Sequence, residues 1–201
     1  MPLITHRGNT PQVHRSAYVA PTAVLCGDVH IGADASVLFG AVVTAEDGHV
    51  RIGRRCVVME NALVRGRGTH PVEVGDNVLI GPHAHVNGAV VGDGCFLATG
   101  CSLFPGSRLG PGVEVRINAV VHANTALSAD AMVPIGWVAV GDPAQILPAC
   151  QHEDIWAVQQ HLDFSETVYG THRDTPAAEL MGRQSEWYGQ HRDDHTIAEG
   201  R

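Results

Sequence analysis

Two histidines and an asparagine lie close together in the segment Gly81-Pro82-His83-Ala84-His85-Val86-Asn87-Gly88. Successive side chains of a β-strand point to opposite faces, so His85 and Asn87, on either side of Val86, share one face. Neutral imidazole is a common ligand of divalent transition metals and a general base near neutral pH. The segment indicates a rebuilt metal site or a polar binding site. The alternative is two surface imidazoles on an exposed strand.

A second candidate segment is Arg65-Gly66-Arg67-Gly68-Thr69-His70. A guanidinium holds carboxylate or phosphate through two parallel hydrogen bonds, so Arg65 and Arg67 predict an anion site. A structural salt bridge is the alternative. A zinc-like ion takes about three or four protein donors. We therefore expect His85 as first metal ligand, His83 as second and His70 as third, with His122 a weaker candidate.

The elements that position these side chains follow a six-residue repeat. Each unit is led by an inward aliphatic residue, and most units carry a small inward residue four positions later. Three units of a short strand and a turn close one triangular coil, and stacked coils pair strand on strand at roughly 4.8 Å. The twenty leads predict about six or seven coils: Val13, Val19, Leu25, Ile31, Val37, Val43, Ile52, Val58, Val64, Val74, Ile80, Val86, Val91, Leu97, Leu103, Leu109, Val115, Val121, Leu127 and Val133.

The chain after the repeat has a helical pattern. Apolar residues at helical spacing predict one helix over 152–162, and Thr175-Pro176 resembles the start of a second. We expect a β-helix domain at 1–148, a helical appendage at 149–190 and a disordered tail at 191–201. The five histidines from His152 onward show no metal-ligand spacing and are expected in solvent. Cys26 is expected to point outward, and the sequence around it carries no signal for a partner.

Composition excludes several classes of function. All 13 basic residues are arginine, which excludes lysine-anchored cofactors and a lysine-containing phosphate loop. A net charge of −8 argues against general nucleic-acid binding. No apolar run is long enough to span a membrane, and the five cysteines show no C-x-x-C pattern. We expect a cytoplasmic protein with no nucleic-acid or membrane partner.

The repeat resembles the hexapeptide-repeat family, which implies an all-β, left-handed parallel β-helix with C-terminal helices. Within that family, the insertions after Val43 and Val64 and the ending Gly141-Asp142-Pro143-Ala144 are similar to the gamma-class carbonic anhydrases. The resemblance implies a homotrimer with active sites at the subunit seams and a zinc ion held by three histidines. It also implies acid–base roles for Glu46 and Glu60, which stand where the family has aspartate.

In this chain, the positions of the family's three zinc-binding histidines hold other residue types. The three positions hold Arg65, Pro82 and Asn87. Arginine and proline cannot coordinate zinc, and a cationic side chain opposes it. We therefore expect carbonic anhydrase activity to be absent or far below the family level, unless His85, His83 and His70 rebuild a metal site. The resemblance places His83 near the position where the family's neighbouring subunit donates its ligand.

The leading hypothesis is a diverged gamma-carbonic-anhydrase-like enzyme acting on a small anionic or acyl substrate, with a coenzyme A thioester one option. Glu60 and Glu46 would be the acid–base groups, Arg65 the anion holder and Asn87 a polar contact. Zinc or another divalent metal is the cofactor if His85, His83 and His70 bind one. Two alternatives stay open: a non-catalytic trimeric scaffold, and an acyltransferase that uses His83 or His85.

Overall fold

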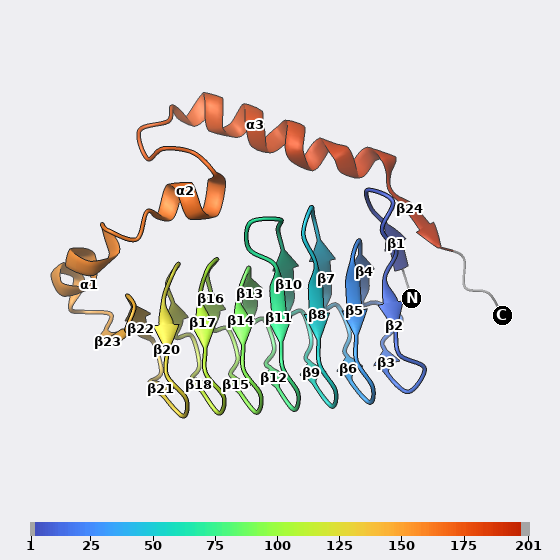
Figure 1. Cartoon of the computed structure of the whole chain (residues 1–201), viewed down its shortest axis with the longest axis horizontal. Coiled ribbons are helices and arrows are strands. Elements are labelled where there is room, and N and C mark those ends of the chain that lie inside the picture. The colour runs from blue at the N-terminus through green and yellow to red at the C-terminus, as the bar shows by residue number, and fades with distance from the viewer. Residues whose placement is uncertain (1–2, 198–201) are drawn as a thin grey trace.

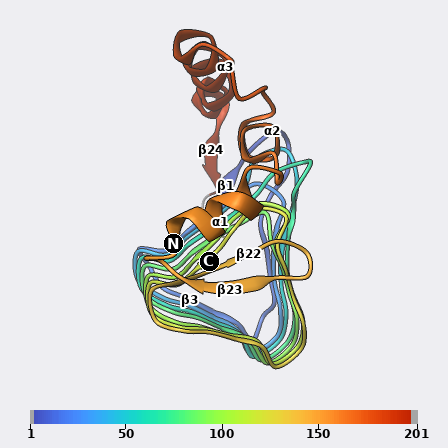
Figure 2. The same ribbon diagram turned by 90° about the vertical axis from the view of Figure 1, so that its left-hand side faces the viewer.

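Each six-residue unit folds as a strand of two to four residues followed by a tight turn, and three units complete one coil. The computed structural model describes residues 3–197 and shows a left-handed parallel β-helix with helices at its C-terminal end (Figure 1). Viewed along its axis, the β-helix has a triangular outline (Figure 2). The predicted fold class is therefore confirmed.

The strands form three parallel faces. Face 1 consists of β2 (Gln12–Val13), β5 (Val29–Ile31), β8 (Val50–Ile52), β11 (Val72–Val74), β14 (Val90–Val91), β17 (Arg108–Leu109) and β20 (Ala126–Leu127). Face 2 consists of β3 (Tyr18–Val19), β6 (Ser36–Val37), β9 (Val57–Val58), β12 (Leu79–Ile80), β15 (Phe96–Leu97), β18 (Glu114–Val115) and β21 (Met132–Val133).

Face 3 carries the candidate site. Its parallel strands are β1 (Leu3–Thr5), β4 (Val24–Cys26), β7 (Val42–Ala45), β10 (Leu63–Gly66), β13 (His85–Asn87), β16 (Ser102–Leu103), β19 (Val120–Val121) and β22 (Trp137–Val140). Two antiparallel strands extend it, β23 (Gln145–Pro148) beside β22 and β24 (His195–Ile197) beside β1. The described residues thus complete about eight turns rather than six or seven, because β1 precedes the first lead and β22 follows the last.

The repeat leads form the core. All of them are buried except Val13 and Val19, which lie in the first coil and are partly covered. The cysteines at inward positions, Cys56, Cys95 and Cys101, are buried as free thiols. The position four residues after Val86 departs from the predicted pattern of small inward residues. Val90, at this position, is 46 % exposed, because the residue dropped before Val91 shifts the inward small position to Ala89.

Replacing Leu103 by Ala should destabilise the protein strongly. Its fully buried side chain stacks in register between Val86 and Val121. The cavity should lower the free energy of unfolding by about 2–5 kcal/mol. Val90→Ala, on the exposed side of β14, is the control and should cost less than about 1 kcal/mol. Urea unfolding followed by circular dichroism measures both, and equal costs would contradict this packing.

The C-terminal part holds α1 (His152–Gln159), α2 (Phe164–Tyr169), α3 (Ala177–Gly189) and a 3₁₀ helix, η1 (Gln190–Asp193). α1 ends before the expected Leu162 and buries Ile155. α3 begins at Ala177, with Pro176 as its N-cap residue in an extended conformation. α3 runs back along the β-helix toward the N-terminal coil (Figure 1). Among the described residues, no helix has the length and apolarity needed to cross a bilayer.

The structure corrects the expectation that residues 191–201 are disordered. Residues 191–193 lie in η1, and β24 pairs antiparallel with β1 from Leu3↔Ile197 to Thr5↔His195. The edge of β1 supplies backbone hydrogen-bond partners that the polar composition of this segment does not reveal. Residues 198–201 lie outside the described part of the chain.

Candidate functional site

The outer surface of face 3 brings several predicted site residues together. Parallel pairing places Arg65 beside Asn87, and Leu63 beside His85. His85 in turn lies beside Ser102. The inward leads between them, Val64 and Val86, are fully buried. The alternation that the sequence predicts therefore does present Arg65, His85 and Asn87 on one outer surface.

Buried polar atoms without partners mark this surface. Asn87 is 8 % exposed, and its Oδ1 has no hydrogen-bond partner among the described residues. Arg65 Nε is likewise buried without a partner, and the Arg65 guanidinium lies 5.8 Å from the centre of the Tyr188 ring. A buried polar atom without a partner costs about 1–3 kcal/mol, so these atoms can bond to a polar ligand at this surface.

Two imidazoles on face 3 are held neutral at pH 7. Burial lowers the pKa of His85, and the Arg65 charge adds to the effect. Burial also lowers the pKa of His122, whose Nδ1 is buried without a partner. A neutral imidazole can accept a proton or bind a metal. Both residues keep those chemistries at physiological pH.

Helix α2 covers part of this surface. The Phe164 ring lies 5.6 Å from the Phe104 ring and 5.4 Å from the His122 ring, measured between centroids. Phe104 also lies 6.1 Å from His85, edge to face. The site is thus walled by the chain's own C-terminal part, an arrangement that the repeat pattern does not reveal.

His70 lies in the loop after β10, at the edge of face 3 where the C-terminal ends of its parallel strands lie. The loop borders a cavity of about 670 Å³. Two backbone hydrogen bonds of 3.0 Å between Arg67 and His70 close the loop. The loop packs against Gly88, where an added Cβ would lie 2.6 Å from the His70 Cβ. Arg67, His70 and Asn87 line the cavity together with α2 and α3. Burial lowers the pKa of His70, with Arg67 adding to the effect.

The remaining predicted residues lie elsewhere. His83 is exposed in the turn before β13, with φ of 57°, and its N–H donates to the Glu60 carbonyl at 3.0 Å. Glu60 occupies the equivalent turn one coil earlier. This corner lies at the opposite end of the strands from His70. A metal site made of His85, His83 and His70 therefore stays a prediction that requires more than one subunit.

Glu46 is buried, 5 % exposed, just after β7. Its carboxylate accepts a hydrogen bond from Thr44 Oγ1 at 3.2 Å and lies 3.0 Å from His191 Nε2. The alternative to an acid–base role for Glu46 is an ion pair with Arg65, or with Arg51 across a subunit seam. Among the described residues of one chain, Glu46 pairs with His191 rather than Arg65, and Arg51 binds Asp28 at 2.9 Å. The pair across a seam stays a prediction. Sequence spacing contains no signal for a contact between residues so far apart.

Comparison with known proteins supports the family resemblance. The family model described as "Bacterial transferase hexapeptide (six repeats)" matches residues 71–105. The gamma carbonic anhydrase 1, mitochondrial, of Arabidopsis thaliana is 33% identical over 176 residues, covering 84% of this chain and 60% of the relative. A carbonic anhydrase of Geobacillus kaustophilus is 29% identical over 86 residues, covering 43% of this chain and 47% of the relative.

The chain is a gamma-carbonic-anhydrase-like hexapeptide-repeat protein. It spans 60% or less of the length of these two curated relatives. The fold is also that of a hexapeptide transferase family protein of Anaplasma phagocytophilum, with a TM-score of 0.53, 23% identity and coverage of 79% of this chain and 91% of that one.

The residues present do not fit the zinc ion of the gamma class. The chemistry of the donor set decides this: at the three ligand positions Arg65 brings a positive charge, Pro82 has no donor atom, and Asn87 is a poor ligand. The chain thus carries a guanidinium, Arg65, at a position where the resemblance implies a zinc-binding histidine.

Proposed function

We propose that this chain is a diverged gamma-carbonic-anhydrase-like enzyme that binds a small carboxylate or acyl substrate on the outer surface of face 3. The observation that carries the proposal is the set of buried polar atoms without partners on that surface: Arg65 Nε, Asn87 Oδ1 and His122 Nδ1. Among the described residues, no carboxylate lies within ion-pair distance of Arg65. Its charge is therefore available to an anionic or carbonyl oxygen of a ligand.

The neutral imidazole of His85 supplies the proton chemistry. In thioester hydrolysis, His85 takes a proton from water as the water oxygen bonds to the acyl carbon. The proton then passes to the sulfur as the carbon–sulfur bond breaks. Arg65 stabilises the negative charge that develops on the carbonyl oxygen. Glu60, predicted as an acid–base group, lies in the turn at the corner of the coil. In this proposal it acts on a substrate bound beside His85 of a neighbouring subunit, not of its own.

The proposed assembly is a homotrimer with the site at the subunit seam. Acyl transfer is the second candidate, because a neutral, half-buried His85 can equally activate an acceptor hydroxyl or amine. Release of thiol from acetyl-coenzyme A, measured with and without amine and alcohol acceptors, separates the two reactions. The cytoplasmic location stays a prediction; the Arabidopsis relative carries a mitochondrial name.

Arg65→Gln should weaken ligand binding without unfolding the protein. Loss of a charged hydrogen bond costs about 1.5–3 kcal/mol, so the affinity for acetate, bicarbonate or acetyl-coenzyme A should fall roughly tenfold to a hundredfold. Isothermal titration calorimetry measures it. Arg54→Gln is the matched control, since Arg54 is exposed and paired with Asp76 at 2.6 Å. Equal affinities in the two variants would refute the anion role, and no binding by the natural chain would favour the scaffold alternative.

A further inference from the structure

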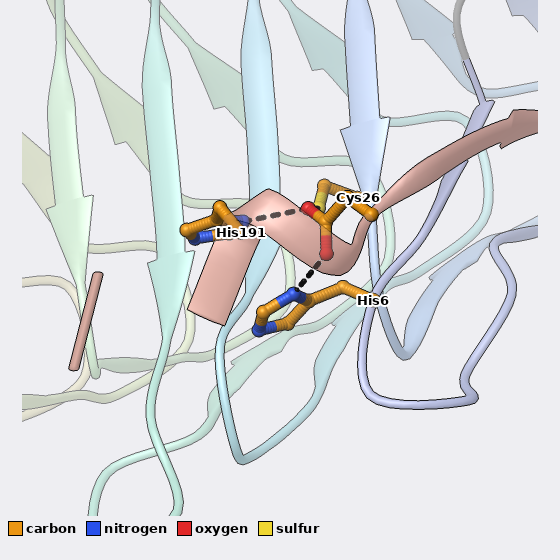
Figure 3. A group of neighbouring side chains, drawn as sticks. His6, Cys26 and His191 are labelled. Carbon is orange, nitrogen blue, oxygen red and sulfur yellow. Dashed lines mark hydrogen bonds and ion pairs between the residues drawn. The ribbon is translucent and has the colours of Figure 1, made fainter. Parts of the chain in front are cut away.

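A second group of side chains lies at the N-terminal end of face 3, outside the site described above (Figure 3). Its members come from three separate parts of the chain. We call it the terminal cluster, and it consists of His6, Cys26, His191 and Asp194. His6 follows β1, Cys26 ends β4, and the other two lie in or just after η1. In the described part of the chain, it is the single group of three or more such donors gathered in this way.

The donor atoms converge closely. One ligand atom from each residue lies within 4.8 Å of all the others. Asp194 is central: its Oδ1 is 2.6 Å from His6 Nδ1, and its Oδ2 is 2.7 Å from His191 Nδ1. Cys26 Sγ lies 3.7 Å from the same Oδ2. Neighbouring ligand atoms of a tetrahedral zinc ion lie roughly 3.3–3.8 Å apart, so modest side-chain rotations convert these hydrogen bonds into coordinate bonds.

The terminal cluster is sheltered but reachable. His6 and Cys26 are 2 % and 5 % exposed, while the His191 side chain is 33 % exposed. The rings of His6 and His191 stack with their centroids 4.2 Å apart. The expectation that His191 lies in solvent is therefore wrong, and Cys26 contacts Asp194, a partner that the sequence does not signal. Burial of polar ligand groups around one point is typical of a metal site, and the exposed side of His191 leaves an entry path.

The local charges favour a cation. The carboxylates of Asp194 and Glu46 both face this group, and Glu46 bonds His191 Nε2 while His191 Nδ1 faces Asp194. A ligating histidine that donates its other nitrogen to a carboxylate is the usual second layer of a zinc site. Burial and the Asp194 charge raise the pKa of the Cys26 thiol to about 12. A divalent cation reverses that effect, because it stabilises the thiolate.

We propose that the terminal cluster binds a divalent transition cation, with zinc the best match to its nitrogen, sulfur and oxygen donors, and that the ion fastens the C-terminal segment to the first coils. Two imidazoles, one thiolate and one carboxylate make a closed four-ligand set, which is typical of structural rather than catalytic zinc. The site is independent of Arg65, His85 and Asn87. Its role is to hold η1 and β24 against β1 and β4.

Cobalt titration of the full-length protein tests the ligand set. After dialysis against a chelator, added Co²⁺ should give a thiolate-to-cobalt charge-transfer band that saturates at about one ion per chain. Cys26→Ser should abolish the band, while Cys150→Ser, which changes an exposed cysteine, should keep it. His191→Ala should weaken binding at least tenfold, and His195→Ala, its neighbour on the same segment, should not. Absence of the band in the natural chain, or its persistence in Cys26→Ser, would overturn the proposal.

Two further measurements distinguish a metal in the terminal cluster from a metal on face 3 and from a segment held without metal. His85→Ala should leave both the cobalt stoichiometry and the thiolate band unchanged; a stoichiometry that falls in this variant, with no thiolate band in the natural chain, would assign the metal to the Arg65–Asn87 surface instead. Zinc should also slow tryptic cleavage after Arg192 several-fold relative to the chelated protein. Identical cleavage with and without zinc would show that hydrogen bonds alone hold the segment. Asp194→Asn, partly exposed in the structure, serves as a ligand variant if changes at buried His6 unfold the chain.

Discussion

Purified protein supplied with zinc should hydrate carbon dioxide at least about a thousandfold more slowly than the roughly 10⁶ per second that zinc hydroxide reaches in an efficient carbonic anhydrase. Rapid hydration requires a metal-bound water whose pKa is lowered toward neutrality. Arg65, Pro82 and Asn87 cannot hold the metal at the gamma-class position. The terminal cluster would not replace it, because an ion held there by all four protein donors would have no coordination position left for water.

Stopped-flow measurement with a pH indicator, with and without a zinc chelator, checks this expectation. The triple variant Arg65→His, Pro82→His and Asn87→His restores an imidazole at each family position and should raise both zinc content and hydration rate. The matched control replaces the same three residues by alanine and should do neither. Fast hydration by the natural chain that the chelator abolishes would show that the chain has rebuilt a catalytic metal site, with His85 the first residue to examine.

Phe96→Asp should convert the expected trimer into monomers. The structure places exposed apolar side chains on face 2 and its adjoining turns, where Phe96 is 42 % exposed, Ile117 44 % and Ile135 65 % exposed. They line a hollow of about 460 Å³ together with Pro82, at the corner beside His83. Contiguous exposed apolar surface of this kind marks a protein–protein contact, and a buried unpaired carboxylate there opposes association.

Light scattering coupled to gel filtration should give about three chains for the natural protein and one for Phe96→Asp. Val90→Asp is the control, because Val90 is 46 % exposed on face 1, away from this corner; it should remain trimeric. A natural protein that is monomeric at micromolar concentration would contradict the assembly. The outward residues Leu63, Phe104 and Val120 of face 3 are a poorer contact surface, because Phe164 of the same chain packs on Phe104 and all three are only partly exposed.

The sequence by itself determines the β-helix and the residues that face outward from it. Each coil imposes the same requirement on its residues, an inward aliphatic side chain every six positions, so the constraint is local and is repeated along the chain. The positions of Arg65, His85 and Asn87 on one surface follow directly from that period. The six-residue repeat does not extend to the two ends of the β-helix. β1 and β22 lie outside the repeat, so the repeat alone predicts too few turns.

Only the tertiary structure shows which residues the C-terminal segment contacts. Cys26 and Asp194 are 168 residues apart in the chain, and His191 and Glu46 are 145 apart. No spacing rule connects such residues, because their contact depends on the direction that α3 takes along the β-helix and on the pairing of β24 with β1. The stacking of Arg7 and Arg67 on Trp187, at 4.5 Å and 5.0 Å from the ring centre, helps to set that direction. Local periodicity therefore places the outward residues of each coil, whereas only the docked helix brings the two ends of the chain into one site.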